Sequence, residues 1–579
     1  MKPNIAVFVV MMLAALVAPA IPVDVSSAVA DTDAYLKRME KLGFAGVVLV
    51  ARNGAPLLAA GYGMADREHG RRWTPATVST IGSITKQFTA AAILKLQEEG
   101  RLRVTDPISA YFPDVPADKV PITLHHLLTH SSGLLDPEGI DDWDPVGREE
   151  YVRRVLARKL AFPPGQGFEY ANANFSLLGM IIEKLTNRSY EYFLREKLFL
   201  PCGMFETGYL LPSWGDGRMA QGYRGKELWG TVLGRPLDAD GPYWGLRANG
   251  GIHSTGYDML RWVQALLEGR ILSAESLKMC WTPHVREAGD AHYGYGWSIA
   301  TGPNNLKVVT HNGGNGIFFA DLAIVPDEKW AFFFMTNVAA SLPGANDLKD
   351  TIGFRFLDGR PYPAIPDVRE IPEGSLPSFC GDYELAGKDG RFRVSVEGEG
   401  LALEPQGWKA FSALHSVSAI DAARCERLNR LLDKIVAANR AANFKLQFKA
   451  YGGRVPLERL KERWQEITGE IEAVNGPILR HEILGTARTT ERDETVVRFI
   501  GERGNAERTY VWAMDREASL LGMSVRGLSV RLHFVPVGGM EFASWDGGLR
   551  PSKRLRFTAQ PGGGMTLQLG EVGLPAMRK

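Results

Sequence analysis

Strand-like segments lie on both sides of a long helical stretch, and this order constrains the fold of the 579-residue chain more than any other feature. Alternating apolar and small residues around an Asn53-Gly54 turn predict a β-hairpin. Its strands are expected at 46–51 and 56–62, and further strands at 295–300, 308–311, 317–325 and 330–336. Helical periodicity is found at 83–102, 124–129, 148–159, 175–186 and 257–267, and a last helix is expected near 345–357. The helices are therefore expected as a block inserted into an antiparallel sheet, an α+β fold.

A proline-rich stretch follows this region. Five prolines fall between residues 361 and 377, which predicts a linker. The linker would separate a domain at 31–360 from a mostly β carboxy-terminal region at 378–579. That second region mixes strand patterns with helical ones, and a barrel with an α+β insertion near 416–525 is one arrangement that fits. It carries no motif whose chemistry we can name.

The amino terminus resembles a signal peptide. A single charge, Lys2, precedes an apolar stretch from Ile5 to Ile21, and small residues follow at Ala28 and Ala30. This order predicts a signal peptide over 1–30 and an exported protein, periplasmic or secreted. A membrane anchor is the alternative, but the unbroken apolar run is shorter than the roughly 20 residues that a span needs. We therefore expect no stable membrane span after cleavage.

Charge and cysteine content exclude several classes of protein. Lys and Arg number 67 against 66 Asp and Glu, a net charge of +1 that argues against nucleic-acid binding. The four cysteines, Cys202, Cys280, Cys380 and Cys425, are widely spaced and form no CxxC pair, so a metal or redox site is not expected. A disulfide remains open.

Ser83 and Lys86 open the clearest helix of the chain. Residues at i and i+3 share a helix face, so the hydroxyl and the amine are expected side by side. A serine becomes a nucleophile when a neighbouring base takes its proton, and a desolvated lysine can be that base. An N-cap serine followed by a solvated lysine would give the same pattern.

Tyr170 and Asn172 form a second motif, after a Pro- and Gly-rich loop at 163–167. Two residues apart on a loop, they can point to one side. The phenol can exchange a proton with a leaving group, and the amide can hold a substrate carbonyl. An ordinary turn with a packed aromatic ring is the alternative.

The third motif is His311-Asn312-Gly313-Gly314, at the end of a predicted strand. Glycines there allow the backbone to approach a ligand closely. A backbone N–H of this segment and that of Ser83 could form an oxyanion hole, and His311 could contact a substrate carboxylate. A β-bulge or hairpin turn with an exposed histidine is the alternative.

Together and in this order, the three motifs resemble those of the serine β-lactamase and penicillin-binding-protein family. SxxK, YxN and HxG are similar to the branch that holds class C β-lactamases, D-alanyl-D-alanine carboxypeptidases, D-aminopeptidases and β-lactamase-like esterases. The segments 124–133 and 250–255 resemble the same family, and the likeness covers about 32–360. It implies a β-lactamase/transpeptidase-like fold.

The resemblance also implies roles for the motif residues. Ser83 would be the acylated nucleophile, Lys86 its proton partner, and Tyr170 the general acid/base, oriented or lowered in pKa by Lys86. This chemistry uses side chains and backbone alone, so no cofactor and no metal is implied. An acyl-enzyme would form and then transfer to water or an amine.

Substrate binding would fall to Asn172 and to the segment His311, Asn312, Gly313 and Gly314. Asn172 would hold the substrate amide, and the Gly314 N–H would complete the oxyanion hole with Ser83. His311 stands where true β-lactamases keep a lysine. A histidine is only partly charged near neutral pH, so an anionic β-lactam should bind less well.

The sequence thus predicts an exported serine hydrolase that acts on D-amino-acid peptides or amides, or on small esters. Acylation by β-lactams is compatible with it, and efficient β-lactamase activity is disfavoured. Two alternatives stay open: a β-lactamase-like carboxylesterase, and a non-catalytic binding protein that retains the fold. The expected partner is a small-molecule or peptide substrate, and the oligomeric state is left open.

Other clusters in the helical region have structural interpretations. The acidic run at 136–144 is interpreted as a solvated loop, with a calcium loop as the alternative. His125, His126 and His130 lack the glutamate of an HExxH zinc motif and are interpreted as structural. Several aromatic residues could line a substrate groove or cap the core: Trp214, Trp229, Tyr243, Trp244 and Trp297.

Overall fold

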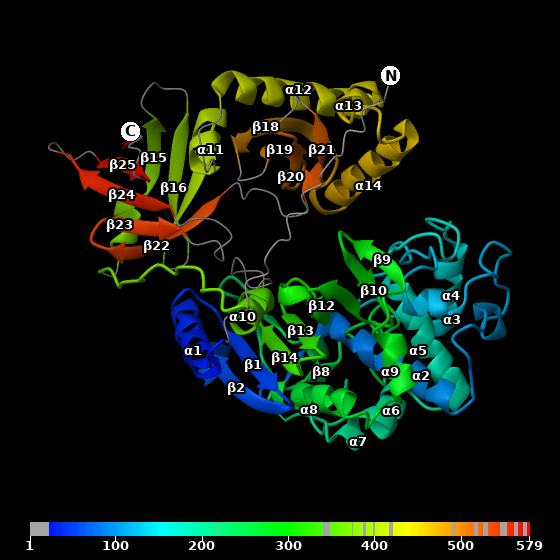
Figure 1. Ribbon diagram of the computed structural model, residues 1–579. Coiled ribbons are helices and arrows are strands. Elements are labelled where there is room, and N and C mark those ends of the chain that lie inside the picture. Colours follow the sequence, from blue (N-terminus) through cyan, green and yellow to red (C-terminus); the bar gives the residue numbers. More distant parts are fainter. Residues whose placement is uncertain are drawn as a thin grey trace, which may run out of the picture. The chain divides into compact units, whose positions relative to one another are not determined.

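The chain forms two compact units, Met1–Pro363 and Ala364–Lys579, each with its own sheets (Figure 1). The computed structural model describes residues 23–215, 217–339, 348–372, 374–385, 390–397, 400–415, 421–488, 492–514, 519–524, 531–544, 553–560, 565–570 and 576–578.

An antiparallel sheet of eight strands forms the centre of the first unit, in the order β2-β1-β14-β13-β12-β11-β10-β9. Its strands are β1 (Gly46–Arg52), β2 (Ala55–Tyr62), β9 (Val285–Ala288), β10 (Ala291–Tyr293), β11 (Ser298–Thr301), β12 (Lys307–Gly314), β13 (Phe319–Val325) and β14 (Trp330–Thr336). The amino-terminal hairpin pairs with the last strand, Gly46 opposite Thr336. Strands from both ends of the region therefore share one sheet, which confirms the predicted fold class.

Helices cover both faces of this sheet. On one face, Phe356 of α10 (Leu348–Leu357) packs on Trp330 and Phe332 of β14, with ring centroids 5.5 and 6.0 Å apart. Alternate residues of a strand point to opposite faces, so the other side of β14 faces α8 (Gly256–Leu267). Because both faces are covered, the residues 46–51 of β1 are all buried and do not alternate.

The helical block lies between β2 and β9 in the sequence. Its helices are η1 (Gly82–Ile84), α2 (Thr85–Glu98), η2 (Ile108–Ala110), α3 (Leu124–Leu128), α4 (Arg148–Ala157), α5 (Asn172–Thr186), α6 (Tyr190–Leu194), η3 (Arg195–Phe199), α7 (Leu200–Cys202), η4 (Val232–Gly234), α8 and α9 (Ala274–Cys280). Short strands accompany them: β3 (Met64–Asp66), β4 (Arg71–Arg72), β5 (Ser79–Thr80), β6 (Gly222–Arg224), β7 (Glu227–Gly230) and β8 (His253–Ser254). Helix α2 is buried on all sides over its first ten residues, 85–94. It is the central helix of the block, and it begins directly after the Ser83 turn.

The second unit is a closed barrel that carries a large insertion. The barrel follows the turn η7 (Leu376–Phe379) and contains β15 (Gly381–Leu385), β16 (Arg391–Glu397), β17 (Gly400–Gln406), β22 (Leu532–Gly538), β23 (Glu541–Ser544), β24 (Arg554–Ala559), β25 (Met565–Leu569) and β26 (Ala576–Arg578). Aromatic side chains such as Tyr383, Phe392 and Phe534 are fully buried in its core.

The insertion lies between β17 and β22. It consists of α11 (Trp408–His415), α12 (Ala422–Arg440), α13 (Lys445–Ala450), α14 (Leu457–Asn475), β18 (Ile478–Arg488), β19 (Asp493–Gly501), β20 (Asn505–Trp512) and β21 (Leu520–Ser524). The four strands form one sheet, and α12 and α14 pack on it through Leu432 and Trp464 against Phe499 and Trp512. The carboxy-terminal region is thus mostly β with helical segments, as expected.

Helix α1 (Val25–Lys41) crosses the predicted signal cleavage site. The Asp24 carboxylate accepts hydrogen bonds from the N–H groups at its start, and Ala28 is fully buried. A cut after Ala30 would remove this capped, packed start. The predicted apolar stretch Ile5–Ile21 lies outside the described residues. Among the described helices, none has the length and apolarity to cross a bilayer.

A buried ion pair fastens α10 to the middle of the sheet. Lys349 Nζ lies 3.3 Å from an Asp321 carboxylate oxygen of β13 and donates to Thr310 Oγ1 of β12 at 3.0 Å. Burial raises the pKa of Asp321 to about 6, and Lys349 opposes that rise. The pair therefore holds β12, which leads into the predicted HNGG motif, against the helix layer.

We expect Lys349→Met to lower the free energy of unfolding by about 3–5 kcal/mol, because it leaves the Asp321 carboxylate buried without its cation. The control is Arg52→Met, which breaks the exposed ion pair with Glu328. It should lower the free energy of unfolding by less than about 1 kcal/mol. Urea unfolding of the full chain measures both. Equal losses in the two variants would contradict the importance of the buried pair.

Candidate active site

The segment β5–η1–α2 places Ser83 at the start of the buried helix. Strand β5 pairs with β8, and the Ile81 N–H donates to Ile252 O at 2.9 Å. The chain then turns through η1, where Thr85 Oγ1 donates to Gly82 O at 2.7 Å. Lys86 follows one turn after Ser83, and its Nζ lies 3.0 Å from Ser83 Oγ. The structure therefore brings these two residues together as the i and i+3 spacing predicts.

Lys86 is fully buried and has three hydrogen-bond acceptors. Besides Ser83 Oγ, its Nζ donates to Asn172 Oδ1 and to the backbone carbonyl of Asn249, each at 2.8 Å. Burial lowers the pKa of Lys86 to about 7, against the opposing effect of two nearby carboxylates, Asp136 and Asp142. The charged and neutral forms therefore have similar populations near neutral pH.

The three contacts fix the direction of the amine. A neutral amine has two hydrogens and one lone pair. The carbonyl oxygens of Asn172 and Asn249 can only accept, so they hold the two hydrogens. The lone pair of Lys86 then faces Ser83, whose hydroxyl can donate to it. In the neutral form, the arrangement is that of a general base beside a nucleophile.

Asn249 belongs to a strained loop before β8. The preceding residue, Ala248, has a left-handed backbone with φ of 69°. Its carbonyl accepts from Thr89 Oγ1 of α2 at 2.6 Å, and its N–H donates to the Tyr209 hydroxyl at 3.0 Å. These contacts hold the strained backbone that aims the Asn249 carbonyl at Lys86.

Tyr170 lies beside both residues. Its hydroxyl forms a hydrogen bond with Ser83, and its ring centroid lies 4.8 Å from Lys86 Nζ. Loss of surrounding water raises the pKa of Tyr170 above its ordinary range, although the Ser83 hydrogen bond opposes this. The lowered pKa of Tyr170 that the family resemblance allows is not found. The structure instead keeps the phenol protonated, so that it can donate a proton.

His130 positions the Tyr170–Asn172 loop. Its ring packs on that of Tyr170 with centroids 4.3 Å apart. Its Nδ1 accepts from the Ala171 N–H at 3.3 Å and from Asn174 Nδ2 at 3.0 Å, and Asn174 Oδ1 in turn accepts from Ser132 Oγ at 2.6 Å. Burial holds the pKa of His130 well below its usual value. The role of His130 is therefore structural: it holds the Tyr170–Asn172 loop in place.

Strand β12 approaches η1 without an intervening side chain. Strand β11 pairs only with the first half of β12, 307–310, so the second half lies free of that neighbour. A Cβ on Gly313 would lie 2.2 Å from Ile81 O and 2.3 Å from the Ser83 nitrogen. Only glycine fits there, and the contact brings the Gly314 backbone to the same pocket as Ser83.

His311 differs from its expected placement. Its Nε2 lies 2.8 Å from the Tyr293 hydroxyl, and its Nδ1 lies 2.6 Å from Asn312 O. A carbonyl can only accept, so Nδ1 carries the proton and Nε2 accepts from Tyr293. Burial lowers the pKa of His311 to about 3, and the neighbouring Lys86 charge adds to this. The ring is therefore neutral near pH 7 and has no nitrogen left for a substrate carboxylate.

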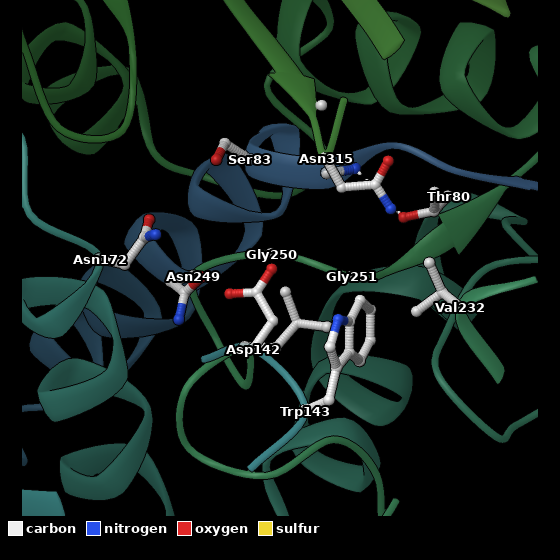
Figure 2. A pocket seen from close by; sticks show the side chains of 13 residues that line it. Thr80, Ser83, Asp142, Trp143, Asn172, Val232, Asn249, Gly250, Gly251 and Asn315 are labelled. Atoms are coloured by element: carbon white, nitrogen blue, oxygen red, sulfur yellow. Dashed lines mark hydrogen bonds between the residues drawn. The ribbon is translucent and has the colours of Figure 1, made fainter. Parts of the chain in front are cut away.

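A pocket opens at Ser83 (Figure 2). It is lined by Thr80, Gly82, Ser83, Asp142, Trp143, Asn172, Val232, Leu246, Asn249, Gly250, Gly251, Gly314 and Asn315. Of the predicted binding residues, Asn172 and Gly314 line it, whereas His311, Asn312 and Gly313 do not. Four polar or aromatic lining residues were not predicted: Asp142, Trp143, Asn249 and Asn315. The one signal in the sequence for the first two is the acidic run at 136–144, and a solvated loop does not describe Asp142, which lines the pocket.

The other predicted clusters do not contribute to the described lining of the pocket. Trp244 and Trp297 are buried in the core. His125 Nδ1 lies 2.8 Å from the Tyr295 hydroxyl. Within the described residues, no group of histidine, cysteine and acidic side chains has the geometry to hold a metal ion.

Comparisons with known proteins identify the family. A family model described as Beta-lactamase matches residues 33–353. Penicillin-binding protein 4* of Bacillus subtilis (strain 168) is 29% identical over 396 residues, which cover 64% of this chain and 85% of that protein. PbpX of the same organism is 31% identical over 268 residues, 46% of this chain. The chain spans slightly less than two thirds of PbpX, 64%.

A solved structure extends the likeness to both units. The octameric penicillin-binding protein homologue from Pyrococcus abyssi aligns with a TM-score of 0.53, over 95% of this chain and 100% of that chain. The two are 21% identical in sequence, so the comparison concerns the fold.

We expect Gly313→Ala to push β12 away from η1 and to slow the reaction of Ser83 with a fluorophosphonate at least about tenfold, because the new methyl group overlaps Ile81 O and Ser83 N. Gly147→Ala is the matched control, since nothing lies within 4 Å of its added Cβ. Labelling rates followed by mass spectrometry measure both. A Gly313→Ala variant that reacts like the control would show that the close approach is unnecessary.

Proposed function

The chain belongs to the β-lactamase family of serine hydrolases, and from that premise we propose that it cleaves amide or ester bonds through an acyl-enzyme on Ser83. The observation that carries the proposal is the fully buried Lys86, whose pKa is lowered to about 7 and whose lone pair the two carbonyl acceptors direct at Ser83. A pKa near the working pH is what a general base requires.

Acylation uses Ser83, Lys86 and Tyr170. Ser83 Oγ attacks the substrate carbonyl carbon as its proton passes to Lys86 Nζ, 3.0 Å away. The N–H groups of Ser83 and Gly314 would stabilise the oxyanion. When the bond to the leaving group breaks, the departing nitrogen or oxygen takes the Tyr170 proton, and Lys86 returns a proton to Tyr170. An ester on Ser83 remains.

Hydrolysis reverses the order of events. A water molecule attacks the ester carbonyl and gives up a proton to the Lys86–Tyr170 pair. The second tetrahedral intermediate then expels Ser83 Oγ, which takes that proton back. Asn172 takes no part in the proton transfers: its Oδ1 accepts from Lys86, and its Nδ2 would donate a hydrogen bond to the carbonyl of the substrate amide.

The proposed substrates are D-amino-acid peptides or amides, or small esters. The preference for D-residues rests on the resemblance of the motifs. The pocket adds a constraint: among the described residues that line it there is no lysine or arginine, and His311 is neutral. A carboxylate on the substrate, as in benzylpenicillin or a peptide with a free carboxy terminus, would lack a cationic partner.

A carboxylesterase with no peptide role is the second candidate. The same absence of a cationic partner favours it, because short esters carry no carboxylate. Short-chain nitrophenyl esters and D-alanyl peptides separate the two candidates.

Export to the periplasm or beyond is part of the main proposal, supported by the order of charge, apolar stretch and small residues over 1–30.

We expect the rate of fluorophosphonate labelling to rise with pH through about 7 and then to level off. The pKa of Lys86 is lowered from 10.5 to about 7, so the neutral, proton-accepting form dominates above that pH. Ser83→Ala should abolish labelling, and Lys86→Met should slow it by about 10²- to 10⁴-fold. Lys95→Met, on the same helix, is the control and should label normally. A rate independent of pH between 6 and 9 would exclude Lys86 as the base.

We expect benzylpenicillin to acylate Ser83 no faster than its methyl ester does, because the described lining of the pocket offers no lysine or arginine for the free carboxylate. Intact-mass spectrometry of the chain with each compound measures the adduct, with Ser83→Ala as the blank. If the free acid reacts about tenfold faster or more, a cationic carboxylate site exists and the proposed substrate constraint is wrong.

A further inference from the structure

Asp142 is the one acidic side chain among the described residues that line the pocket. Figure 2 shows its carboxylate and the Trp143 ring entering the pocket from one loop, with Ser83, Asn172 and Asn249 around the same space. The carboxylate is close enough to Lys86 to raise that pKa. Any substrate whose carbonyl reaches Ser83 therefore passes near a negative charge.

A tight turn presents the two side chains. The Asp144 N–H donates to Asp141 O at 3.2 Å, and the Asp141 N–H donates to an Asp144 carboxylate oxygen at 2.8 Å. Asp142 and Trp143 occupy the centre of this turn. Its backbone packs on Gly245, where a Cβ would lie 2.5 Å from Asp141 O. The turn is thus fixed at both ends and against a neighbouring loop. Its backbone therefore sets the direction of the Asp142 side chain.

Nothing in the described part of the chain pairs with the Asp142 carboxylate. No hydrogen bond or ion pair reaches it, whereas nearby Asp136 accepts the backbone N–H groups of Asn172 and Ala173 at the start of α5. Burial raises the pKa of Asp142 to about 6; the charges of Asp141 and Asp136 add to this, and Lys86 opposes it. A carboxylate that is partly desolvated and has no partner is a site for a cation.

Trp143 makes an alkylammonium group the fitting cation. Its indole stands next to the carboxylate and close to a second ring, Trp229, with centroids 6.3 Å apart. Aromatic faces attract ammonium groups, tryptophan most strongly. The pocket thus combines a carboxylate, an aromatic ring and the nucleophile, and it has no lysine or arginine of its own among the described lining residues.

We propose that Asp142 binds a free ammonium group on the acyl part of the substrate, so that the enzyme cleaves amides or esters of amino acids whose α-amino group is free. This inference rests on the proposed function at Ser83 and narrows it. It predicts an enzyme that removes a group from the amino-terminal residue, and it disfavours one that recognises a carboxy-terminal carboxylate.

The test compares two substrates that differ by the amine alone, alanyl 4-nitroanilide and propionyl 4-nitroanilide, with both enantiomers of alanine. We expect the alanyl compound to be preferred at least about tenfold in kcat/KM. Asp142→Asn should lower kcat/KM for it about ten- to hundredfold, chiefly through KM, because a charge-assisted hydrogen bond to the ammonium is lost. The loss should be at least about tenfold larger for the alanyl than for the propionyl compound, and fluorophosphonate should still label Ser83 because Ser83 and Lys86 are intact.

Asp141→Asn is the matched control. It removes the same charge from the neighbouring residue, whose side chain is not part of the described pocket lining. It should leave both substrates unchanged. Equal losses for alanyl and propionyl compounds in Asp142→Asn would mean that Asp142 acts in the chemistry and not in amine recognition, which overturns the inference.

A binding measurement covers the case in which neither anilide is cleaved. Alaninamide should protect Ser83 from fluorophosphonate at concentrations at least about tenfold lower than propionamide, and Asp142→Asn should remove the difference. Equal protection with Ser83 still reactive overturns the amine site and leaves the proposed function standing. A Ser83 that never labels would remove the proposed function, and the inference with it.

Discussion

A lysine with no exposed surface is the constraint on which the site depends. A buried ammonium group must donate hydrogen bonds to acceptors or lose its proton. Both hold in part for Lys86, because it has acceptors and its pKa is lowered to about 7. Its acceptors come from three separate segments: the turn before α2, the start of α5, and the loop before β8. Each segment is secured independently, by β5–β8 pairing, by Asp136 at the start of α5, and by the contacts of Ala248. The helical block is thus organised around one amine.

The sheet forms the opposite wall of the site, at a place where β12 lacks both the neighbouring strand β11 and a side chain. Half of β12 has no β11 partner, and glycine at 313 lets its backbone meet the Ser83 turn. The strand side chain that could have been charged, His311, is instead neutral and tied to Tyr293. Its ring faces Tyr170, with centroids 6.2 Å apart. A second charge next to Lys86 would push the lysine pKa lower still, so a neutral His311 helps to keep that pKa near 7.

Local patterns predicted much of the fold and part of the site. Periodicity between residues that are close in the sequence is enough to predict the shared helix face of Ser83 and Lys86, the hairpin at 46–62 and the strands at 308–336. The rest depends on contacts between distant segments. A backbone carbonyl such as that of Asn249 has no sequence signature at all. Whether a histidine is charged depends on its partners, and His311 finds Tyr293 only in the folded sheet. Asp142 could not be told from its acidic neighbours, because the turn that directs it is set by packing on Gly245.

The charges in the pocket are coupled, and the coupling bears on catalysis. The carboxylates of Asp136 and Asp142 both raise the pKa of Lys86, and burial outweighs them. Asp136 is permanently engaged with the start of α5, but Asp142 has no partner in the described part of the chain. An ammonium group bound to Asp142 would cancel its field at Lys86. The pKa of Lys86 would then fall, and more of the lysine would be in the neutral form that accepts the Ser83 proton. A substrate with a free amine would therefore strengthen the base that attacks it, whereas a neutral substrate would leave the resting balance unchanged.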